Sequence, residues 1–308
     1  MRKGLRYLSF QPRLPGPLPD NRCGFADTGT AVSRWIHSAA AHVQPVLQAL
    51  ADLFFQRTCT ACGRHLGRRE RRLCLHCDLD LPLTYFWMQE RNAMADKFNA
   101  LIQKRLDRQW ETPEKETHGR HPVAHEPYAR AAALFYYNAS AGFRRIPQAI
   151  KYEGAVGLGR HFGRRLGTCL KEAAPYRDVT HVVPVPLHWT RQWERGYNQA
   201  AVIAREIAAI LNVPCEEKLL YRRQRTRSQT LLAPEEKAAN VDGAFAVRST
   251  GKQAVRPTAA VHILLVDDVF TTGATLEACH AAIREAFPDS GPHRLRISVA
   301  TLACVGTL

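Results

Sequence analysis

A short apolar run, followed by two acidic residues, a threonine–glycine loop and a helical stretch, constrains the fold of this chain most. Residues 263–266 are all aliphatic, as expected of a central parallel strand that is covered on both faces. We expect this strand, at 262–266, to stop at Asp267 and Asp268. Apolar residues then recur at helical spacing over 275–287. A strand, a tight loop and a helix in this order indicate an α/β domain.

The loop between this strand and the helix has the properties of an anion site. A helix N-terminus presents free backbone N–H groups and a partial positive charge, and Gly273 allows the backbone to approach a ligand closely. Four neighbours can add contacts to phosphate oxygens: Thr271, Thr272, Ala274 and Thr275. The carboxylates of Asp267 and Asp268 would repel phosphate, so they suit sugar hydroxyls or a hydrated Mg²⁺. The segment therefore predicts a sugar-phosphate site; the alternative is an ordinary turn whose side chains only cap the helix.

The chain from residue 128 onward alternates between strand and helix patterns. Expected strands cover 131–137, 181–185, 262–266 and 296–302, and expected helices cover 143–152, 156–172, 198–211 and 275–287. Helix-length segments between strands indicate right-handed crossovers and a mainly parallel sheet flanked by helices. We expect a poorly ordered extension with a helix at 1–45, followed by a helix and cysteine module at 46–82. A linker or insertion at 83–127, with a candidate helix at 92–106, would then lead into the α/β domain at 128–308.

Two pairs of cysteines, Cys59 with Cys62 and Cys74 with Cys77, have metal-ligand spacing. Four thiolates from two C-x-x-C hooks match a tetrahedral zinc site with every position filled, which is structural rather than catalytic. The odd total of nine cysteines also fits a reducing compartment better than a disulfide framework. An iron–sulfur cluster and redox disulfides are the alternatives. The arginines between the pairs, which suit a nucleic-acid backbone or a solvated face, are Arg64, Arg68, Arg69, Arg71 and Arg72.

A second basic segment follows the expected strand at 181–185. That strand ends because Pro184 and Pro186 cannot continue a hydrogen-bond ladder. Arg191 and Arg195 come next and can pair bidentately with diphosphate oxygens. A solvated helix start, capped by Asn198, would have the same pattern.

The whole chain is strongly basic. Forty-three lysines and arginines outnumber 28 acidic residues, and the net charge of +15 favours nucleic acid or phosphorylated small molecules as partners. Residues 222–246 hold several of the arginines and suit either a mobile loop over an active site or a plain solvated loop. No apolar window approaches the length of a membrane span and no signal-peptide pattern is present, so we expect a cytoplasmic protein.

Together these segments resemble the ComF family of phosphoribosyltransferase-like proteins. The resemblance rests on the I-K-Y-x-G run at 150–154, P-V-P-L at 184–187, R-x-x-x-R-G-Y-N-Q at 191–199, T-x-x-Q-x-x-L at 226–232 and V-D-D-V-F-T-T-G-A-T at 266–275. It covers residues 46–308, with the cysteine knuckle included and 107–126 as an insertion. Lys237 departs from the family pattern, because arginine is usual there, so the charge is kept and the bidentate fork is lost.

The resemblance implies a type I phosphoribosyltransferase-like fold and a site for phosphoribosyl diphosphate with Mg²⁺. Asp267 and Asp268 would meet the ribose 2′- and 3′-hydroxyls, and residues 271–275 would cradle the 5′-phosphate. Further substrate contacts are assigned to Lys151, Pro186, Arg191, Arg195, Thr226 and Gln229. No residue stands out as a general base, so the acceptor of a phosphoribosyl transfer is unassigned.

Two functions of different classes stay open at this point. One is a transferase that moves phosphoribosyl to an unknown acceptor. The other is a non-catalytic competence or DNA-uptake factor that binds single-stranded DNA, works with the competence machinery and uses the pocket as a ligand sensor. The arginine-rich knuckle favours the second, whereas the acid pair and threonine loop favour ligand binding in both.

Overall fold

The computed structural model describes residues 57–110, 126–137, 142–223, 243–255, 260–288, 290–291 and 294–306. All of them belong to one unit, Arg57–Leu308. The expectations for residues 1–45, and for the helix that leads into the cysteine module, lie outside the described residues.

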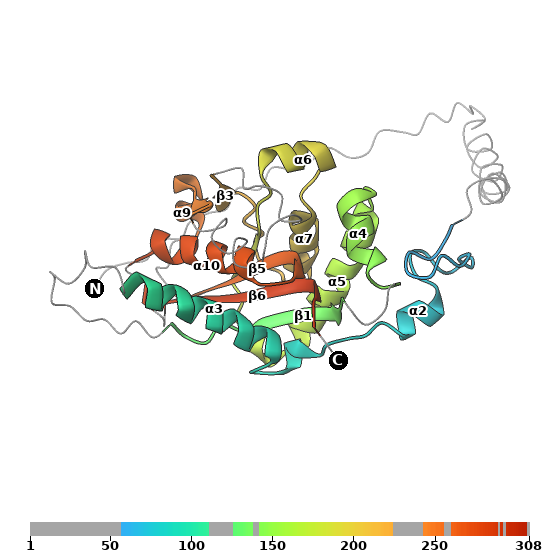
Figure 1. The fold of residues 1–308 in the computed structure, drawn as a ribbon, viewed down its shortest axis with the longest axis horizontal. Coiled ribbons are helices and arrows are strands. Elements are labelled where there is room, and N and C mark those ends of the chain that lie inside the picture. The colour runs from blue at the N-terminus through green and yellow to red at the C-terminus, as the bar shows by residue number, and fades with distance from the viewer. Residues whose placement is uncertain are drawn as a thin grey trace, which may run out of the picture. The chain divides into compact units, whose positions relative to one another are not determined.

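A four-stranded sheet, in which every neighbouring pair of strands is parallel, forms the centre of this unit. Its order is β1-β6-β5-β2, with bounds β1 Ala131–Tyr136, β2 His181–Pro184, β5 Val261–Phe270 and β6 Leu295–Cys304. Figure 1 shows β5, β6 and β1 one below another in this order. The two central strands are buried along most of their length, as their aliphatic runs predicted. The expected α/β fold class, with a mainly parallel sheet between helices, is thereby confirmed.

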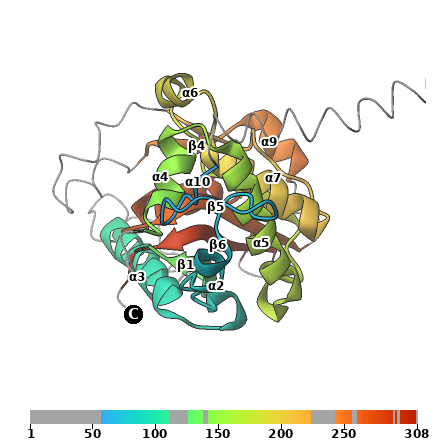
Figure 2. The same cartoon turned by 90° about the vertical axis from the view of Figure 1, so that its right-hand side faces the viewer.

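Among the described residues, five helices cover the two faces of the sheet. Their bounds are α3 Ala93–Trp110, α4 Arg145–Tyr152, α5 Val156–Glu172, α7 Gln199–Leu211 and α10 Ala274–Ala286. On one face α4, α5 and α7 share an apolar cluster with Leu264 and Val266. On the other face α3 and α10 share a cluster with Ile263 and Leu265. Alternate residues of β5 thus enter two separate cores, as the two-residue period of a strand requires, and Figure 2 shows α5 beside α7 on the first face.

Smaller elements complete the described residues. Their bounds are α2 Leu75–Leu79, α6 Trp189–Arg195, β3 Leu220–Arg222, β4 Phe245–Val247 and α9 Ser249–Ala254. β3 and β4 pair antiparallel. The segment that joins them, 224–242, lies outside the described residues, and so do Thr226, Gln229 and Lys237. Within the described ranges, no helix is both long and apolar enough to cross a bilayer.

The strand that carries the two acids is longer than the sequence predicted. β5 continues past Asp267 to Phe270, so the expected end at residue 266 is wrong. The reason is that β6 is equally long and supplies ladder partners: Asp267 pairs with Thr301, and Phe270 pairs with Cys304. The acids are therefore held by a sheet ladder rather than by a loop, which fixes the direction of their side chains.

Helix α3 confirms the candidate helix within the segment that looked like a linker, and it extends to Trp110. Asn92 begins the helix: its Oδ1 accepts a hydrogen bond from the Ala95 N–H at 2.9 Å, and its Nδ2 donates to the Ala131 carbonyl oxygen at 2.9 Å. The side chains of Phe98 and Ile102 are buried against the sheet. These contacts connect α3 firmly to β1, while the division of the chain at residues 83 and 128 stays a prediction.

A buried histidine at the start of β5 makes the stability of the fold depend on pH. His262 Nδ1 lies 2.9 Å from Asp178 Oδ1, and His262 Nε2 lies 2.8 Å from Ser298 Oγ. Burial lowers the pKa of His262, and the Asp178 carboxylate offsets this only in part. His280 of α10 is also buried, and burial lowers its pKa as well.

We therefore expect stability to fall as the pH drops below about 6.5, because these histidines bind protons in the unfolded chain more readily than in the folded chain. Each of these histidines contributes a slope of at most about 1.4 kcal/mol per pH unit. Thermal unfolding between pH 7.5 and pH 5 measures the effect. The variant His262→Gln should show a shallower dependence than the wild type, and the exposed control His65→Gln should not. Equal slopes for all three chains would contradict this account.

Candidate functional site

Two carboxylates and one ammonium group meet near the C-terminal end of β5. Lys151, near the end of α4, pairs with Asp268 at 3.2 Å between Nζ and Oδ2, and the two side chains are only 27% and 10% exposed. Asp267 is half-buried, and its Oδ1 accepts a hydrogen bond from the Asp268 backbone N–H at 2.8 Å. The structure thus brings together three of the predicted site residues from two segments that are far apart in the sequence.

The electrostatics of this group leave negative charge available to a ligand. Burial alone would lower the pKa of Lys151, but the carboxylates of Asp268 and Asp267 outweigh it and hold that pKa above its ordinary value. Burial, followed by repulsion from Asp268, raises the pKa of Asp267. Burial and then the charge of Arg191 lower the pKa of Arg222, while Asp267 acts in the opposite direction. A hydroxyl donor or a hydrated cation at Asp267 would relieve its repulsion with Asp268.

The loop after β5 is shaped as the sequence predicted. Gly273 has a φ of 86° and stands at the N-terminus of α10. The Thr272 hydroxyl oxygen accepts a long hydrogen bond of 3.4 Å from the Ala274 N–H. Lys97 of α3 donates from Nζ to the Thr271 carbonyl oxygen at 3.0 Å. Lys97 places a cation beside the loop, and sequence reasoning missed it because no pattern connects residue 97 with residue 271.

An alanine at position 273 should damage both the fold and the site. A Cβ there would lie 2.7 Å from Phe270 Cζ and 3.0 Å from Leu101 Cδ1, and the backbone has a positive φ. We expect Gly273→Ala to cost roughly 2–4 kcal/mol of unfolding free energy, from steric conflict added to the left-handed backbone. Gly243→Ala is the matched control, because Gly243 has a φ of +67° but nothing within 4 Å of its Cβ. Denaturant unfolding of both variants measures the difference, and equal losses would contradict the steric argument.

The R-x-x-x-R-G-Y-N-Q motif positions the backbone on which the site is built. Three hydrogen bonds connect it to neighbouring segments: the Tyr197 hydroxyl to the Ile150 carbonyl oxygen, Gln199 Nε2 to the Lys151 carbonyl oxygen at 3.4 Å, and Asn198 Nδ2 to the Val185 carbonyl oxygen at 3.0 Å. Asn198 Oδ1 also accepts from the Ala200 N–H at 3.0 Å, so the residue caps α7 as the alternative interpretation required. The motif therefore holds the Lys151 segment next to the end of β2.

The residues predicted for the diphosphate side surround this motif. Arg195 donates from Nη1 to Gln199 Oε1 at 3.2 Å, and its guanidinium lies 5.1 Å from the centroid of the Tyr152 ring. Arg191 is half-buried on α6, and Pro186 is buried just after β2. Their contacts with a substrate stay a prediction, because the protein partners of Arg195 show only how it is oriented.

The four paired cysteines form one cluster, as predicted. Their Sγ atoms all lie within 4.8 Å of one another, and three of the four residues are buried. The Sγ atoms of Cys62 and Cys74 are 3.7 Å apart. A tetrahedral zinc ion with Zn–S bonds of about 2.3 Å needs sulfur–sulfur edges of about 3.8 Å. The cluster therefore fits structural zinc.

Two hydrogen bonds support the sulfur atoms of this cluster. Arg64 Nη2 donates to Cys74 Sγ at 3.3 Å, and the Cys74 N–H donates to Cys59 Sγ at 3.3 Å. The bond from Arg64 is the main reason why the pKa of the Cys74 thiol is lowered. The Arg64 contact favours the thiolate form of Cys74, which is the form that binds metal.

Comparison with known proteins supports the resemblance seen in the sequence. No protein-family model matches the chain. Competence protein F of Haemophilus influenzae is 28% identical over 141 residues, which are 45% of this chain and 60% of that protein. DNA utilization protein YhgH of Escherichia coli K12 is 30% identical over 95 residues, which are 31% of this chain and 39% of that protein. The matches thus span less than two thirds of either relative, and they confirm the predicted similarity to competence proteins of the ComF kind.

A solved structure, TT1426 from Thermus thermophilus, overlaps with 48% of this chain and 84% of its own, at 20% identity and a TM-score of 0.26. This TM-score is too low to support a fold assignment. The fold class of this chain therefore rests on its own sheet and helices.

Proposed function

We propose that the chain binds phosphoribosyl diphosphate, or a closely related sugar phosphate, with Mg²⁺ at the C-terminal end of β5. The observation that carries this proposal is the presence of two carboxylates, Asp267 and the Lys151-paired Asp268, directly before the Gly273 loop. Carboxylates accept hydrogen bonds from a sugar diol, and a loop at a helix N-terminus binds phosphate. One ligand that carries both a diol and a phosphate would bind the carboxylates and the loop together.

Each part of the site has its own role in this proposal. Asp267 and Asp268 accept hydrogen bonds from the ribose 2′- and 3′-hydroxyls, and residues 271–275 hold the 5′-phosphate. Arg191 and Arg195, with Pro186 and the segment that contains Thr226 and Gln229, contact the diphosphate side. Lys97 contributes positive charge at the loop, and Lys151 contributes it at Asp268. The cationic side chains would therefore attract an anionic ligand, and the carboxylates would select its hydroxyl groups.

The residues present also suit Mg²⁺. This ion prefers oxygen ligands and binds through one or two carboxylates together with substrate phosphates. Asp267 and Asp268 offer such oxygens, and the raised pKa of Asp267, caused by burial and by Asp268, would fall when a cation binds. The ion would supply charge neutralisation for a leaving diphosphate.

Binding and transfer are separable, and calorimetry tests binding first. Titration of the full chain with phosphoribosyl diphosphate in the presence of Mg²⁺ should release heat and saturate at one site. Absence of binding would overturn the proposal. Release of diphosphate across a panel of bases and amines then tests transfer: the C1′–O bond to diphosphate breaks and diphosphate carries away the bonding electrons, while the acceptor nitrogen bonds to C1′ and loses its proton to solvent. Tight binding without diphosphate release would identify a ligand sensor rather than a transferase.

A second candidate function is the handling of single-stranded DNA during uptake or use of DNA. The names of the relatives, competence protein F and DNA utilization protein, point to it. The cysteine module adds a charge argument: Arg68, Arg69 and Arg71 are exposed, whereas Arg64 bonds to Cys74. Binding of a labelled oligonucleotide that weakens steeply with salt would support this function, because contacts with phosphates release counterions. An oligonucleotide that does not bind even at low salt would exclude it.

A further inference from the structure

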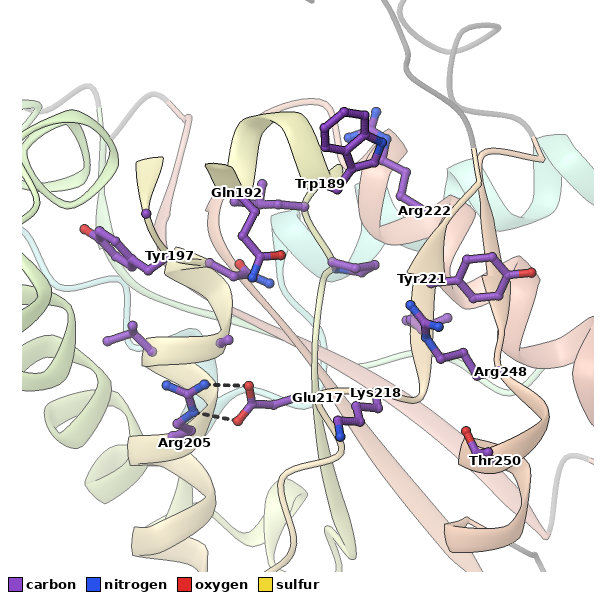
Figure 3. Close-up of a pocket in the computed structure, with 17 residues that line it drawn as sticks. Trp189, Gln192, Tyr197, Arg205, Glu217, Lys218, Tyr221, Arg222, Arg248 and Thr250 are labelled. Atoms are coloured by element: carbon purple, nitrogen blue, oxygen red, sulfur yellow. Dashed lines mark hydrogen bonds and ion pairs between the residues drawn. The ribbon is translucent and has the colours of Figure 1, made fainter. Parts of the chain in front are cut away.

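A cavity of about 740 Å³ lies between α6, α7, β3 with the segment before it, and the start of α9 (Figure 3). Neither Asp267, Asp268 nor any residue of the loop 271–275 lines it. Pro186, which was predicted for the diphosphate side of the sugar-phosphate site, also lines this cavity, so the two regions are adjacent. We call it the α6 cavity. Its volume falls in the range typical of small-ligand sites, roughly 300–1,000 Å³.

Flat side chains border the α6 cavity. Trp189, on α6, has 73% of its surface exposed and lines the cavity. Tyr221, on β3, lines it as well, and the Arg248 guanidinium lies 4.9 Å from the centroid of the Tyr221 ring. Figure 3 shows Trp189 above the cavity on α6 and Tyr221 on the β3 side. Aromatic rings and guanidinium planes are the surfaces on which nucleic-acid bases stack.

The charge of the cavity wall is positive. Glu217 is occupied by a bidentate pair with Arg205, at 2.5 Å from Nε to Oε1 and 2.6 Å from Nη2 to Oε2. Lys218 and Arg248 also line the cavity and are exposed, and neither is paired with a carboxylate among the residues that the structure describes. Gln192, whose side chain hangs from α6 in Figure 3, adds hydrogen-bonding groups. A ligand that combines a flat heterocycle with phosphate would match both the aromatic rings and the exposed cations of the cavity wall.

The face of α6 indicates that the ligand continues beyond the cavity. Trp193 lies four residues after Trp189, which places both on one side of the helix, and 85% of Trp193 is exposed. Trp193 does not line the cavity. Two exposed tryptophans on one face of a helix, in a chain with a net charge of +15, form a surface on which successive bases of a strand can stack.

We propose that the α6 cavity binds one nucleotide of single-stranded DNA, with the next base stacked on Trp193. The base stacks against Trp189 and Tyr221, and the phosphates lie at Lys218 and Arg248. This inference rests on the second candidate function, the handling of single-stranded DNA, and it gives that function a location separate from the cysteine module.

The test is fluorescence anisotropy of the full chain with a labelled oligo(dT) of about twenty nucleotides. Lys218→Gln combined with Arg248→Gln should weaken binding about tenfold and reduce the slope of log K against log salt by about 1.4, or about 0.7 for each lost phosphate contact. Trp189→Ala and Trp193→Ala should each weaken binding about tenfold, the effect of losing one stacked base. Lys171→Gln combined with Arg108→Gln removes the same charge from other exposed positions and should change little, and Tyr85→Ala is the control for an exposed aromatic residue.

The outcomes separate this inference from the function on which it rests. Failure of the wild-type chain to bind the oligonucleotide would remove the DNA-handling function itself. Wild-type binding that the Lys218/Arg248 double variant and Trp189→Ala both leave intact, or that the charge control weakens equally, would overturn the α6 cavity alone. Displacement of the oligonucleotide by deoxythymidine monophosphate at a similar phosphate concentration, with Trp193→Ala unchanged, would assign the cavity to a free nucleotide and overturn the strand. Thermal unfolding of each variant, compared with that of the wild-type chain, shows that it is folded.

Discussion

An Asp267→Asn variant is expected to bind phosphoribosyl diphosphate with Mg²⁺ at least about 100-fold more weakly than the wild-type chain, without loss of thermal stability. Hydrogen bonds to a charged group are worth about 1.5–3 kcal/mol each, and the amide also removes a charge that a metal ion would use. A loss of about 2.7 kcal/mol corresponds to 100-fold. The near-isosteric amide leaves the β5–β6 ladder at Thr301 unchanged.

Stability should move in the opposite direction from binding. Burial and the neighbouring Asp268 raise the pKa of Asp267, so the charged form of this residue destabilises the folded chain. A raised carboxyl pKa means that its contribution to stability is present at low pH and is lost as the pH rises. Asp267→Asn removes that loss, and its Tm at pH 8 should equal or exceed that of the wild type. A site residue that is tuned for a ligand shows this pattern, whereas a purely structural residue does not.

The matched control for this prediction is Asp178→Asn, the same substitution near the start of β5 at the other end of the sheet. Asp178 accepts hydrogen bonds from His262 and Arg296, so the variant should lose stability and keep its affinity for the ligand. Calorimetric titration and thermal unfolding of both variants measure the two quantities. Unchanged affinity in Asp267→Asn would remove the carboxylate pair from the proposed site.

Local sequence patterns predicted the parts of the site that are contiguous in the chain. The apolar run before Asp267 identified a central strand, and the threonine–glycine loop identified the turn into α10, because backbone geometry and burial act within a few residues. The end of β5 was predicted wrongly for the converse reason. Whether a strand continues to Phe270 depends on the partner that β6 offers at Cys304, and no local pattern contains that partner.

The parts that depend on distant contacts were not predictable in the same way. Lys97 reaches the loop only because α3 packs beside α10, whereas the sequence predicted a candidate helix over residues 92–106 and indicated no neighbour for it. The α6 cavity combines Trp189, Tyr221 and Arg248 from three separate elements. Motif recognition found the glutamine and asparagine that follow Tyr197, but only the structure shows that they hold the backbone of Lys151 and Val185. A motif thus indicated where the candidate site lies, and long-range packing decided which side chains come near it.

The cysteine cluster leads to the second large effect: Cys77→Ser is expected to lower the unfolding free energy of the chain by about 3–5 kcal/mol and to abolish stoichiometric zinc. Cys77 is buried, and its sulfur belongs to the four-sulfur cluster. Structural zinc binding contributes directly to folding free energy, and serine does not replace a thiolate ligand. The cluster also shares an apolar core with Ile146 and Leu158, so its loss should reach the helices that cover the sheet.

For a unit of this size, about 1 kcal/mol shifts Tm by roughly 2–4 °C, so we expect a fall of about 6–20 °C. Removal of metal from the wild-type chain with a chelator should reproduce that fall and should change the Cys77→Ser variant no further. Cys169→Ser is the control, since Cys169 of α5 is only half-buried and lies outside the cluster. Metal analysis and thermal unfolding of the three chains measure both effects. A wild-type chain that binds no zinc would show that the four sulfur atoms stabilise the fold only by packing. A Cys77→Ser variant that is as stable as Cys169→Ser would show that the cluster does not support the fold through a metal.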